Sequence, residues 1–408
     1  MKRVVITGMA GVTGLGEDWE TVEAALRMGC NAVRTIFEWE MYPDLHTRLA
    51  CPLENFTVPA HYPRKMLRSI WRVGLLAVRA CELALRSAGL HDDPSIADGL
   101  MGVAYGSSDG AVEPIRVFGR MMEAGSMLGV SSTSYIQMMP HTTALNIGLF
   151  LDLKGRIIPA SSACTSGSQA VGFTYEAIAQ GRQLLMLAGG AEELSVPGTA
   201  VFDTLYATST RNDQPTLTPR PFDLQRDGLV VGEGAAALVL EEYEHAKARG
   251  ANILAEVVGF GCNSDGNHIT QPTAETMAVA LRQALDAAGL PPHAIGYVSA
   301  HGTATDRGDV AECEATFQAL GDRVPISSMK SYLGHTLGAC GAIEACWAVE
   351  MMRRKWFAPT LNLEEVDPDC AMLDHIAGSA REIDTEFVMS NNFAFGGINT
   401  SLIFRRLS

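Results

Sequence analysis

Short apolar runs alternate with longer segments of helical periodicity along the first part of the chain. Runs of Val, Ile, Leu, Ala and Gly predict strands at residues 3–7, 99–106 and 184–190. A helix is expected at 18–28, and a longer helical region follows the second strand. The run at 235–250 passes from strand-like to helical. Strands that alternate with helices in this way are typical of layered α/β proteins.

The same kind of alternation starts again in the last third of the chain. Residues 253–261 predict a strand, 273–290 an amphipathic helix, and 295–303 a buried strand that runs into a loop. We therefore expect an N-terminal half, residues 1–250, and a C-terminal half, residues 251–408.

The two halves contain a similar local pattern. RIIPASSACTSGSQAVGFTYEAIAQG (156–181) and PISSMKSYLGHTLGACGAIEACWAVEMMRRK (325–355) each predict a strand, a turn of small residues and a helix. In the first pattern the helix is expected at 167–179, and Cys164 stands in the turn before it. His335 stands in the turn of the second. If the halves arose by duplication, Cys164 and His335 meet at the interface between them.

Composition and charge narrow the class of protein. With 408 residues, 47% hydrophobic positions and 40 glycines, the chain has ample core for two domains or fused halves. A net charge of -15 argues against a large nucleic-acid footprint, because phosphate binding needs clustered Lys and Arg. No segment is apolar for the length of a membrane span, and the N-terminal apolar run is too short for a signal peptide.

The nine cysteines include no C-x-x-C pair, so they fit neither a disulfide framework nor a zinc ribbon. They predict the reducing environment of the cytoplasm.

Glycines at positions 8, 11, 14 and 16 follow the first strand. Their order does not match G-x-G-x-x-G, so we expect a turn rather than a dinucleotide site.

A basic segment lies at PRKMLRSIWR. Arg64, Arg68 and Arg72 are spaced four apart, so on one helix they share a face, with Lys65 close by. This face is either simply solvated or a patch for an acidic partner.

Cys164 is a candidate nucleophile because of its position before a helix. The helix N-terminus has a partial positive charge, which favours thiolate over thiol. Its free N–H groups also suit an oxyanion hole. The alternative is a buried cysteine that acts as a small hydrophobe.

Two further segments carry ionisable groups among small residues. SAHGTATDRGD (299–309) places His301, Thr303 and Thr305 after a buried strand. SMKSYLGHTLGACGAIE (328–344) places Lys330 and His335 in a loop and Glu344 on the following helix, where small residues permit close backbone approach. A zinc site and a Cys-His hydrolase both remain alternatives, although the histidine spacing matches no zinc motif, and a hydrolase does not need two histidines and a lysine.

The C-terminal segment VMSNNFAFGGINTSLIF predicts two strands around a turn. Phe393, Phe395, Gly396 and Gly397 belong to this turn. The glycine pair beside an aromatic side chain is either a hinge that moves a gate or an ordinary hairpin with a core phenylalanine.

Four of these segments, SSAC, HGTATDRGD, KSYLGHTLGACGAIE and NFAFGGIN, closely resemble the β-ketoacyl-acyl carrier protein synthases in the same order. The resemblance covers nearly the whole chain. It implies a thiolase-like α/β fold, five layers in an α-β-α-β-α stack made of two similar halves, usually in a homodimer, with a heterodimer of related ketosynthases as the alternative.

The resemblance also implies a role for each matching residue. Cys164 matches the acyl-accepting nucleophile, His301 and His335 the paired histidines, and Lys330 and Glu344 their neighbours. The remaining matches are Phe395 for the gate and oxyanion hole, Thr303 and Thr305 for phosphopantetheine contacts, and Arg64, Lys65, Arg68 and Arg211 for docking of the acidic carrier protein.

The implied activity is the decarboxylative condensation of an acyl group on the cysteine with malonyl-acyl carrier protein. It lengthens the chain by two carbons in fatty-acid synthesis. No metal or bound cofactor is expected, because the carrier protein brings its own 4'-phosphopantetheine.

The chain departs from the usual family pattern at two places. Thr165, Ser166 and Gly167 follow the nucleophile where C-A-T-S is usual, and Ala394 and Ile398 flank the usual F-G-G. These departures leave the gating and the substrate size open. A specialised ketosynthase of a polyketide or aryl polyene pathway is therefore the alternative. A non-catalytic chain-length subunit and a thiolase or starter-unit synthase fit the Cys-His-His set less well.

Overall fold

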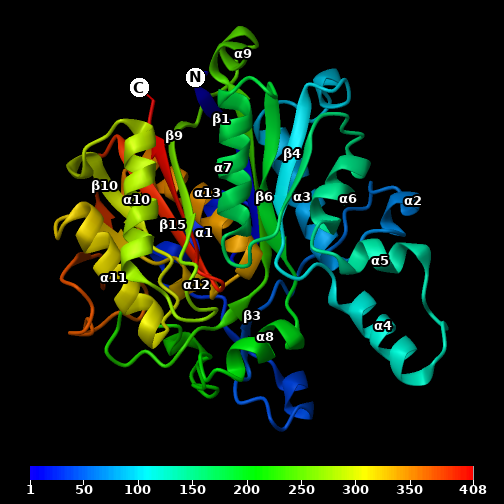
Figure 1. The fold of residues 1–408 in the computed structure, drawn as a ribbon, viewed down its shortest axis with the longest axis horizontal. Helices are drawn as coiled ribbons and strands as arrows, with labels where there is room; N and C mark the ends of the chain where they lie inside the picture. The colour runs from blue at the N-terminus through cyan, green and yellow to red at the C-terminus, as the bar shows by residue number, and fades with distance from the viewer. Residues whose placement is uncertain (408) are drawn as a thin grey trace.

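The computed structural model describes residues 1–407 and contains one large mixed sheet with helices on its faces (Figure 1). The strands of this sheet are β1 (Val4–Thr13), β4 (Met101–Gly106), β5 (Ile157–Ala160), β6 (Leu185–Glu192), β8 (Gly234–Glu242), β9 (Ala255–Ser264), β10 (Ile295–Ser299), β11 (Pro325–Ser327), β13 (Asp374–His375), β15 (Phe387–Ala394) and β16 (Ile398–Arg405). Short strands form two small sheets, namely β2 (Arg34–Thr35), β3 (Leu49–Cys51) and β7 (Val231–Gly232), and β12 (Trp356–Phe357) with β14 (Arg381–Glu382).

Thirteen α-helices are present in the described residues: α1 (Trp19–Arg27), α2 (Arg64–Leu67), α3 (Arg72–Ser87), α4 (Val112–Ala124), α5 (Ser132–Met138), α6 (Thr142–Phe150), α7 (Ser166–Ala179), α8 (Val196–Asp203), α9 (Tyr243–Ala248), α10 (Ala274–Ala288), α11 (Asp306–Leu320), α12 (Lys330–Leu333) and α13 (Cys340–Arg354). Among residues 1–407, none of them has both the length and the apolar character needed to cross a lipid bilayer.

The two halves of the large sheet repeat one topology. The N-terminal half has the spatial order β5-β4-β6-β8-β1, and the C-terminal half has β11-β10-β15-β16-β9, with β13 added at its edge. Counted in chain order within each half, both orders read 3-2-4-5-1. The parallel and antiparallel pairings also correspond strand by strand. The similarity of the two halves thus extends from a short sequence pattern to the whole sheet.

Within residues 1–407, the strands of the two half-sheets pair with each other where β1 meets β9, at residues 4–6 of β1. The predicted division at residues 250 and 251 falls in the loop between α9 and β9. Away from this junction, α7 and α13 lie between the half-sheets and contact strands of both. Helices α3 and α6 pack on the N-terminal half-sheet, α10 packs on the C-terminal one, and α11 packs on α10 (Figure 1). These are the five layers of the predicted fold.

The two inner helices approach each other closely because glycines face each other at their N-termini. A Cβ added at Gly167 would lie 2.8 Å from the backbone nitrogen of Ala342, and one at Gly341 would lie 2.7 Å from that of Ser168. The prediction of close backbone approach around 338–342 is confirmed. Its consequence is that the turns before α7 and α13, which carry Cys164 and His335, lie together.

The glycines after the first strand do not form one turn. Gly8 and Gly11 lie inside β1, which continues to Thr13. A Cβ at Gly8 would be 2.4 Å from the carbonyl oxygen of Ala84, so the glycine is needed where α3 packs on the strand. Only the segment from Thr13 to Gly16 turns, and these two residues exchange both backbone hydrogen bonds.

The expected continuous helix through the basic segment is also wrong. Helix α2 ends before Arg68, and α3 begins at Arg72. Arg72 forms an ion pair with the buried carboxylate of Glu233 at 2.8 Å. The ion pair takes Arg72 out of the predicted patch.

Candidate active site

Cys164 stands in a tight turn between β5 and α7 and is buried. The preceding residue, Ala163, has a φ of 50°, which is strained for a residue with a Cβ. Hydroxyl groups hold the turn: the Ser166 Oγ accepts from the N–H of Ser162 at 2.9 Å and donates to the Ala163 carbonyl at 2.7 Å. The departures from the usual C-A-T-S sequence therefore include a residue that fixes the nucleophile's turn.

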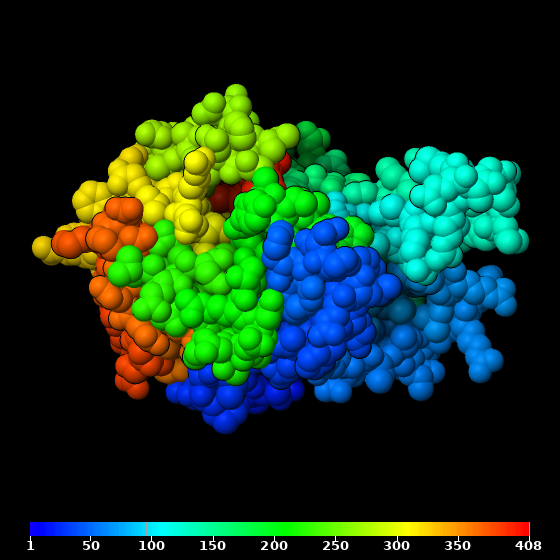
Figure 2. Space-filling model, turned by 90° about the horizontal axis from the view of Figure 1, so that it is seen from below, coloured from blue at the N-terminus to red at the C-terminus, as the bar shows by residue number. Residues whose placement is uncertain are grey.

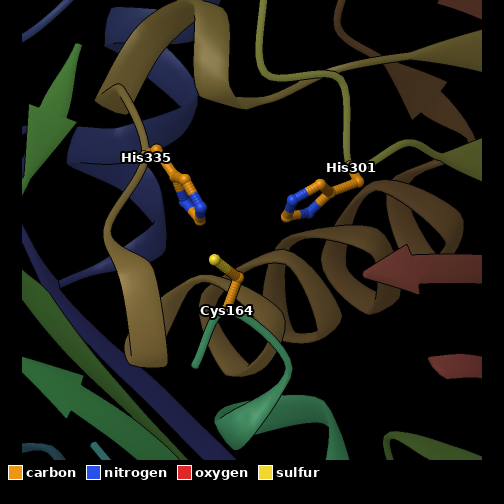
Figure 3. Close-up of side chains that lie close together, drawn as sticks. All are labelled: Cys164, His301 and His335. Atoms are coloured by element: carbon orange, nitrogen blue, oxygen red, sulfur yellow. The ribbon is translucent and has the colours of Figure 1, made fainter. Parts of the chain in front are cut away.

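The two predicted histidines meet Cys164 from the other half of the protein (Figure 3). The sulfur of Cys164 and one nitrogen of each ring lie within 4.8 Å of one another. The rings of His301 and His335 are perpendicular, with an interplanar angle of 89° and centroids 5.2 Å apart. Three side chains from distant parts of the sequence thus point at one small volume.

Backbone hydrogen bonds set the position of both histidines. The N–H groups of His301 and Gly302 donate to the buried carboxylate of Glu312 at 2.7 and 2.6 Å. His335 donates its N–H to the Val230 carbonyl at 2.7 Å and accepts from Gly232 at 2.9 Å. Each imidazole therefore projects from an anchored backbone rather than from a free loop.

A buried ionic network supports His301. Lys330 Nζ lies 2.5 Å from Glu344 Oε1 and 3.1 Å from His301 Nδ1. An ammonium group can only donate, so Nδ1 accepts and the proton of a neutral His301 ring sits on Nε2. Asn392 adds a hydrogen bond from its Nδ2 to Glu344 Oε2 at 2.7 Å. The predicted Lys330 thus contacts His301 directly, and the predicted Glu344 reaches the same ring through Lys330 and Asn392.

Both imidazoles are neutral at physiological pH. Burial holds the pKa of His301 well below its usual value, and Lys330 and His335 lower it further. Burial also lowers the pKa of His335, again with help from Lys330. Among residues 1–407, neither ring nitrogen of His335 has a hydrogen-bond partner, so its single N–H is free to donate to a substrate.

The expected thiolate at Cys164 is not the resting state. Burial raises the pKa of the thiol to about 11, although Lys330 and the backbone N–H groups of Phe395 and Cys164 itself act to lower it. Burial removes water from the charged form, and the charge of Lys330 together with the two backbone N–H groups does not offset that loss. The same N–H groups of Phe395 and Cys164 nevertheless face the sulfur, so the carbonyl oxygen of a thioester attacked by the thiol would lie within their reach, as in an oxyanion hole.

Phe395, the residue expected to act as a gate, lies at the tip of a hairpin. Strands β15 and β16 pair antiparallel up to Ala394 and Ile398, so the two departures from the family pattern are cross-strand neighbours. Phe395, Gly396 and Gly397 form the turn, and both glycines have positive φ angles, of 85° and 70°. The predicted strand–turn–strand is confirmed, except that Phe393 is a buried residue of β15.

A cavity of about 480 Å³ leads to the thiol. Its lining includes Cys164, His301 and His335 at one end, together with Phe202, Phe395 and the hydroxyl residues Thr303 and Thr305. The hydroxyl groups of Thr303 and Thr305 lie 2.9 Å apart. Figure 2 shows the mouth of this hollow, with the C-terminal segment at its base between the green and yellow surfaces. The cavity joins residues expected to bind phosphopantetheine to the catalytic candidates.

The four basic residues expected to dock the carrier protein lie on separate elements of the structure. Arg64, Lys65 and Arg68 are exposed on and just after α2. Arg211 is half-buried in the loop after α8, where it pairs with Asp227 at 3.4 Å and donates to the Gln225 carbonyl at 2.7 Å. Arg211 is therefore partly occupied within the protein, whereas the other three present their charges to solvent.

Sequence reasoning missed two residues in the site. In the sequence Asn392 is only one position of the C-terminal motif, and Cys340 is only one of nine cysteines. Cys340 Sγ donates to the backbone carbonyl of Cys164 at 3.2 Å, and burial raises its pKa well above the usual range. No local signal in the sequence separates Cys340 from an ordinary buried cysteine.

The zinc alternative conflicts with the proton positions. Cys164 and the two histidines are close enough to share an ion. However, Lys330 donates to one nitrogen of His301, and the other nitrogen then carries the ring proton, so neither offers a free lone pair. The donor set fits proton donors better than metal ligands.

Comparison with known proteins gives the family. A buried cysteine that faces two neutral histidines, with a lysine-glutamate pair beside them at the centre of a five-layered duplicated fold, fits a condensing enzyme of the thiolase type. The N-terminal domain model of β-ketoacyl synthases matches residues 1–246, and the C-terminal domain model matches residues 254–364. The chain therefore belongs to the β-ketoacyl synthase family, whose members are acyltransferases.

Individual relatives match over the whole chain. The 3-oxoacyl-[acyl-carrier-protein] synthase 2 of Vibrio cholerae is 38% identical, covering 100% of this chain and 99% of its own. The crystal structure of a β-ketoacyl synthase from Burkholderia phymatum STM815 is 70% identical with a TM-score of 0.99, and the ishigamide ketosynthase/chain length factor is 31% identical with a TM-score of 0.92. Both structures cover 100% of this chain and 100% of their own.

Proposed function

We propose that this protein is an elongating 3-oxoacyl-[acyl-carrier-protein] synthase with Cys164 as its acyl acceptor. The observation that carries the proposal is the convergence of one thiol, two neutral imidazoles and two backbone N–H groups at the end of a cavity. The family membership and the full-length relatives of that name support it.

In the first half-reaction Cys164 attacks the thioester of an acyl carrier. The N–H groups of Phe395 and Cys164 stabilise the negative charge on the carbonyl oxygen while the bond from Sγ to the acyl carbon forms. The carrier sulfur then leaves and takes up the proton that the Cys164 thiol has lost. Acyl transfer therefore needs no net change of charge in the buried site.

In the second half-reaction malonyl thioester loses carbon dioxide. The electron pair of the broken C–C bond moves onto the thioester oxygen as an enolate. His301 donates from Nε2 and His335 from its free ring N–H, and both groups stabilise this oxygen without adding a positive charge beforehand. The neutral state of both rings suits this role, because a donor is needed and a strong acid is not.

The enolate carbon then attacks the acyl group on Cys164. The new C–C bond forms, the bond to Sγ breaks, and a proton from solvent restores the thiol. The product is a 3-ketoacyl carrier protein whose chain is two carbons longer. Loss of carbon dioxide supplies the driving force, so we propose that no metal or bound cofactor takes part.

The carrier protein brings the substrate on its own 4'-phosphopantetheine arm. We assign Thr303 and Thr305 to the arm because both line the cavity. Arg64, Lys65 and Arg68 are assigned to the acidic carrier because their charges are exposed, and Arg211 is a weaker candidate because of its pairing with Asp227. A solved relative in which a ketosynthase is bound to its acyl-carrier protein supports such a partner, at 29% identity and a TM-score of 0.86.

We further propose a homodimer in the cytoplasm. Strand β5 is at the edge of the large sheet, and Ile157 on it is 41% exposed, so this edge suits pairing with a second copy. All nine cysteines are unpaired, which agrees with a reducing compartment. Light scattering tests the assembly: a monomer contradicts the proposal, and assembly only with a related ketosynthase supports the heterodimer.

Fatty-acid elongation is the first candidate for the pathway. The second candidate is a specialised ketosynthase, which the likeness to the ishigamide ketosynthase and the departures at Ala394 and Ile398 favour. The acyl length that the protein prefers separates the two.

The test is intact-mass measurement on the protein mixed with acyl carriers of different length, followed by malonyl carrier. We expect an acyl mass on Cys164 and then a 3-ketoacyl carrier. Cys164→Ala is the control and should show neither product. Condensation that persists in Cys164→Ala, or no acyl uptake from any carrier, contradicts the proposed function.

A further inference from the structure

The side chain of Asn392 lies inside the active site, although the proposed mechanism assigns it no part. It is fully buried near the end of β15. Its Nδ2 lies 2.7 Å from Glu344 Oε2 and 3.4 Å from His301 Nδ1. It also lies 3.7 Å from Cys340 Sγ. One carboxamide thus connects the supporting carboxylate to the ring of a catalytic histidine.

The neighbours of this carboxamide determine its orientation. If Oδ1 occupied the place of Nδ2, an oxygen would face the Glu344 oxygen at 2.7 Å with no proton between them. In the observed orientation Oδ1 points at Gly341, where an added Cβ would lie 2.7 Å from it. Oδ1 has no hydrogen-bond partner among the described residues. The hydrogen bonds that Nδ2 donates to Glu344 and His301 therefore hold the amide in this orientation. The absence of a side chain at Gly341 leaves room for Oδ1.

His301 Nδ1 faces two groups that can only donate. Lys330 Nζ approaches it at 3.1 Å and Asn392 Nδ2 at 3.4 Å. Two donors at one nitrogen require a lone pair there, which leaves the ring proton on Nε2. We propose that Asn392 is a positioning residue that acts with Lys330 to hold His301 as the Nε2–H tautomer during malonyl decarboxylation.

Asn392 complements Lys330 because Lys330 divides its hydrogen bonds between His301 and Glu344. Lys330 also binds Glu344 Oε1, and Asn392 binds the other oxygen of the same carboxylate. Without Asn392, one oxygen of Glu344 loses its partner, and Lys330 becomes the single donor to Nδ1. The carboxylate is then free to rotate, and the Nδ1–H form of His301 is no longer opposed by a second donor.

Several ionisable groups face His301 from the elements packed around it. They are Lys330 on α12, Cys340 and Glu344 on α13, Glu312 on α11, His335 before α13, and Cys164 before α7. Asn392 itself is uncharged. Truncating it changes the hydrogen bonds at Nδ1 but leaves the number of charges unchanged, so a change of tautomer is separable from a general electrostatic effect.

Two variants test the inference. Asn392→Ala removes both donated hydrogen bonds, and Asn392→Leu removes them while keeping a similar volume, and neither variant adds a charge. The first readout is the tautomer of His301 from ¹⁵N chemical shifts of histidine-labelled protein, with His301→Gln for the assignment. We expect Nε2–H in the wild type and a tautomer mixture in both Asn392→Ala and Asn392→Leu.

The second readout is kinetic. We expect Asn392→Ala to lower malonyl decarboxylation at least about tenfold, less than the 10²–10³-fold that follows loss of a direct donor. Acyl uptake by Cys164 should stay within about twofold, because it does not use His301. Asn391→Ala is the matched control, since this neighbour on β15 is also buried but its amide has no partner among the described residues. It should keep the wild-type tautomer and decarboxylation rate.

Unchanged His301 tautomer and decarboxylation in Asn392→Ala overturn the inference. If that variant does not fold, the similarly sized Asn392→Leu decides through the Nδ1 shift, and a wild-type shift there also overturns it. The kinetic part of the inference rests on the proposed function. Failure of the proposed function is distinguishable from failure of the inference on Asn392. In the first case the wild-type protein takes up no acyl group, while the tautomer of His301 remains measurable.

Discussion

Removing Glu344 should destabilise the protein more than removing a surface carboxylate at a similar distance from its cation. Lys330 and Glu344 form an ion pair at 2.5 Å with side chains that are 2% and 4% exposed. Burial lowers the pKa of Lys330, but Cys340 and Glu344 outweigh this effect and raise it overall, so the lysine is charged. Glu344→Ala leaves that charge buried without its carboxylate.

The expected loss of stability in Glu344→Ala follows from the burial of the ion pair. Breaking a buried pair by removing one partner costs about 3–5 kcal/mol. A chain of this length has an unfolding entropy of about 0.9 kcal/mol/K, so the melting temperature should fall by about 3–6 °C. The control is Glu386→Ala, which breaks an exposed pair with Arg405 at 2.7 Å. Exposed pairs contribute about 0–1 kcal/mol, which corresponds to about 1 °C or less.

Calorimetry at one scan rate and at neutral pH measures the melting temperatures of Glu344→Ala and Glu386→Ala. A second variant, Lys330→Met with Glu344→Leu, removes both charges and should recover most of the lost stability, because apolar replacements of a buried pair are often neutral. Equal melting temperatures for Glu344→Ala and Glu386→Ala would refute the reasoning that the buried charge dominates.

Three further outcomes follow from the site. His335→Ala should lower malonyl decarboxylation about 10²–10³-fold while acyl uptake persists, and release of carbon dioxide at the wild-type rate would contradict its role as a donor. The alkylation rate of Cys164 by iodoacetamide should rise about tenfold per pH unit from pH 7 to 10, because burial raises its pKa to about 11; a plateau near neutral pH would contradict this. Gly167→Ala should cost about 1–3 kcal/mol, since its Cβ would lie 2.8 Å from the Ala342 nitrogen, and calorimetry showing no loss would mean that the helices can separate there.

The periodicity of the sequence predicted most of the sheet. Apolar runs located β1, β4, β6 and β9, and the short echo between halves anticipated a repeated topology. In strands and helices the apolar residues recur with a characteristic spacing along the chain, so both kinds of element can be recognised in the sequence. The errors came where tertiary packing decides the local structure. Gly8 stays in a strand because α3 packs on it, and Arg72 leaves the basic patch because Glu233 binds it.

The sequence by itself determined which chemical groups were available. It identified a thiol before a helix, two histidines in small-residue turns, and a nearby lysine and glutamate. Only the tertiary structure decided their state, because pKa values and tautomers depend on burial and on contacts between residues far apart in the chain. It made Cys164 a protonated thiol, made both imidazoles neutral, and placed Asn392 against His301 across 91 positions. Desolvation and hydrogen bonding act through space, and neither can be read from neighbours in the sequence.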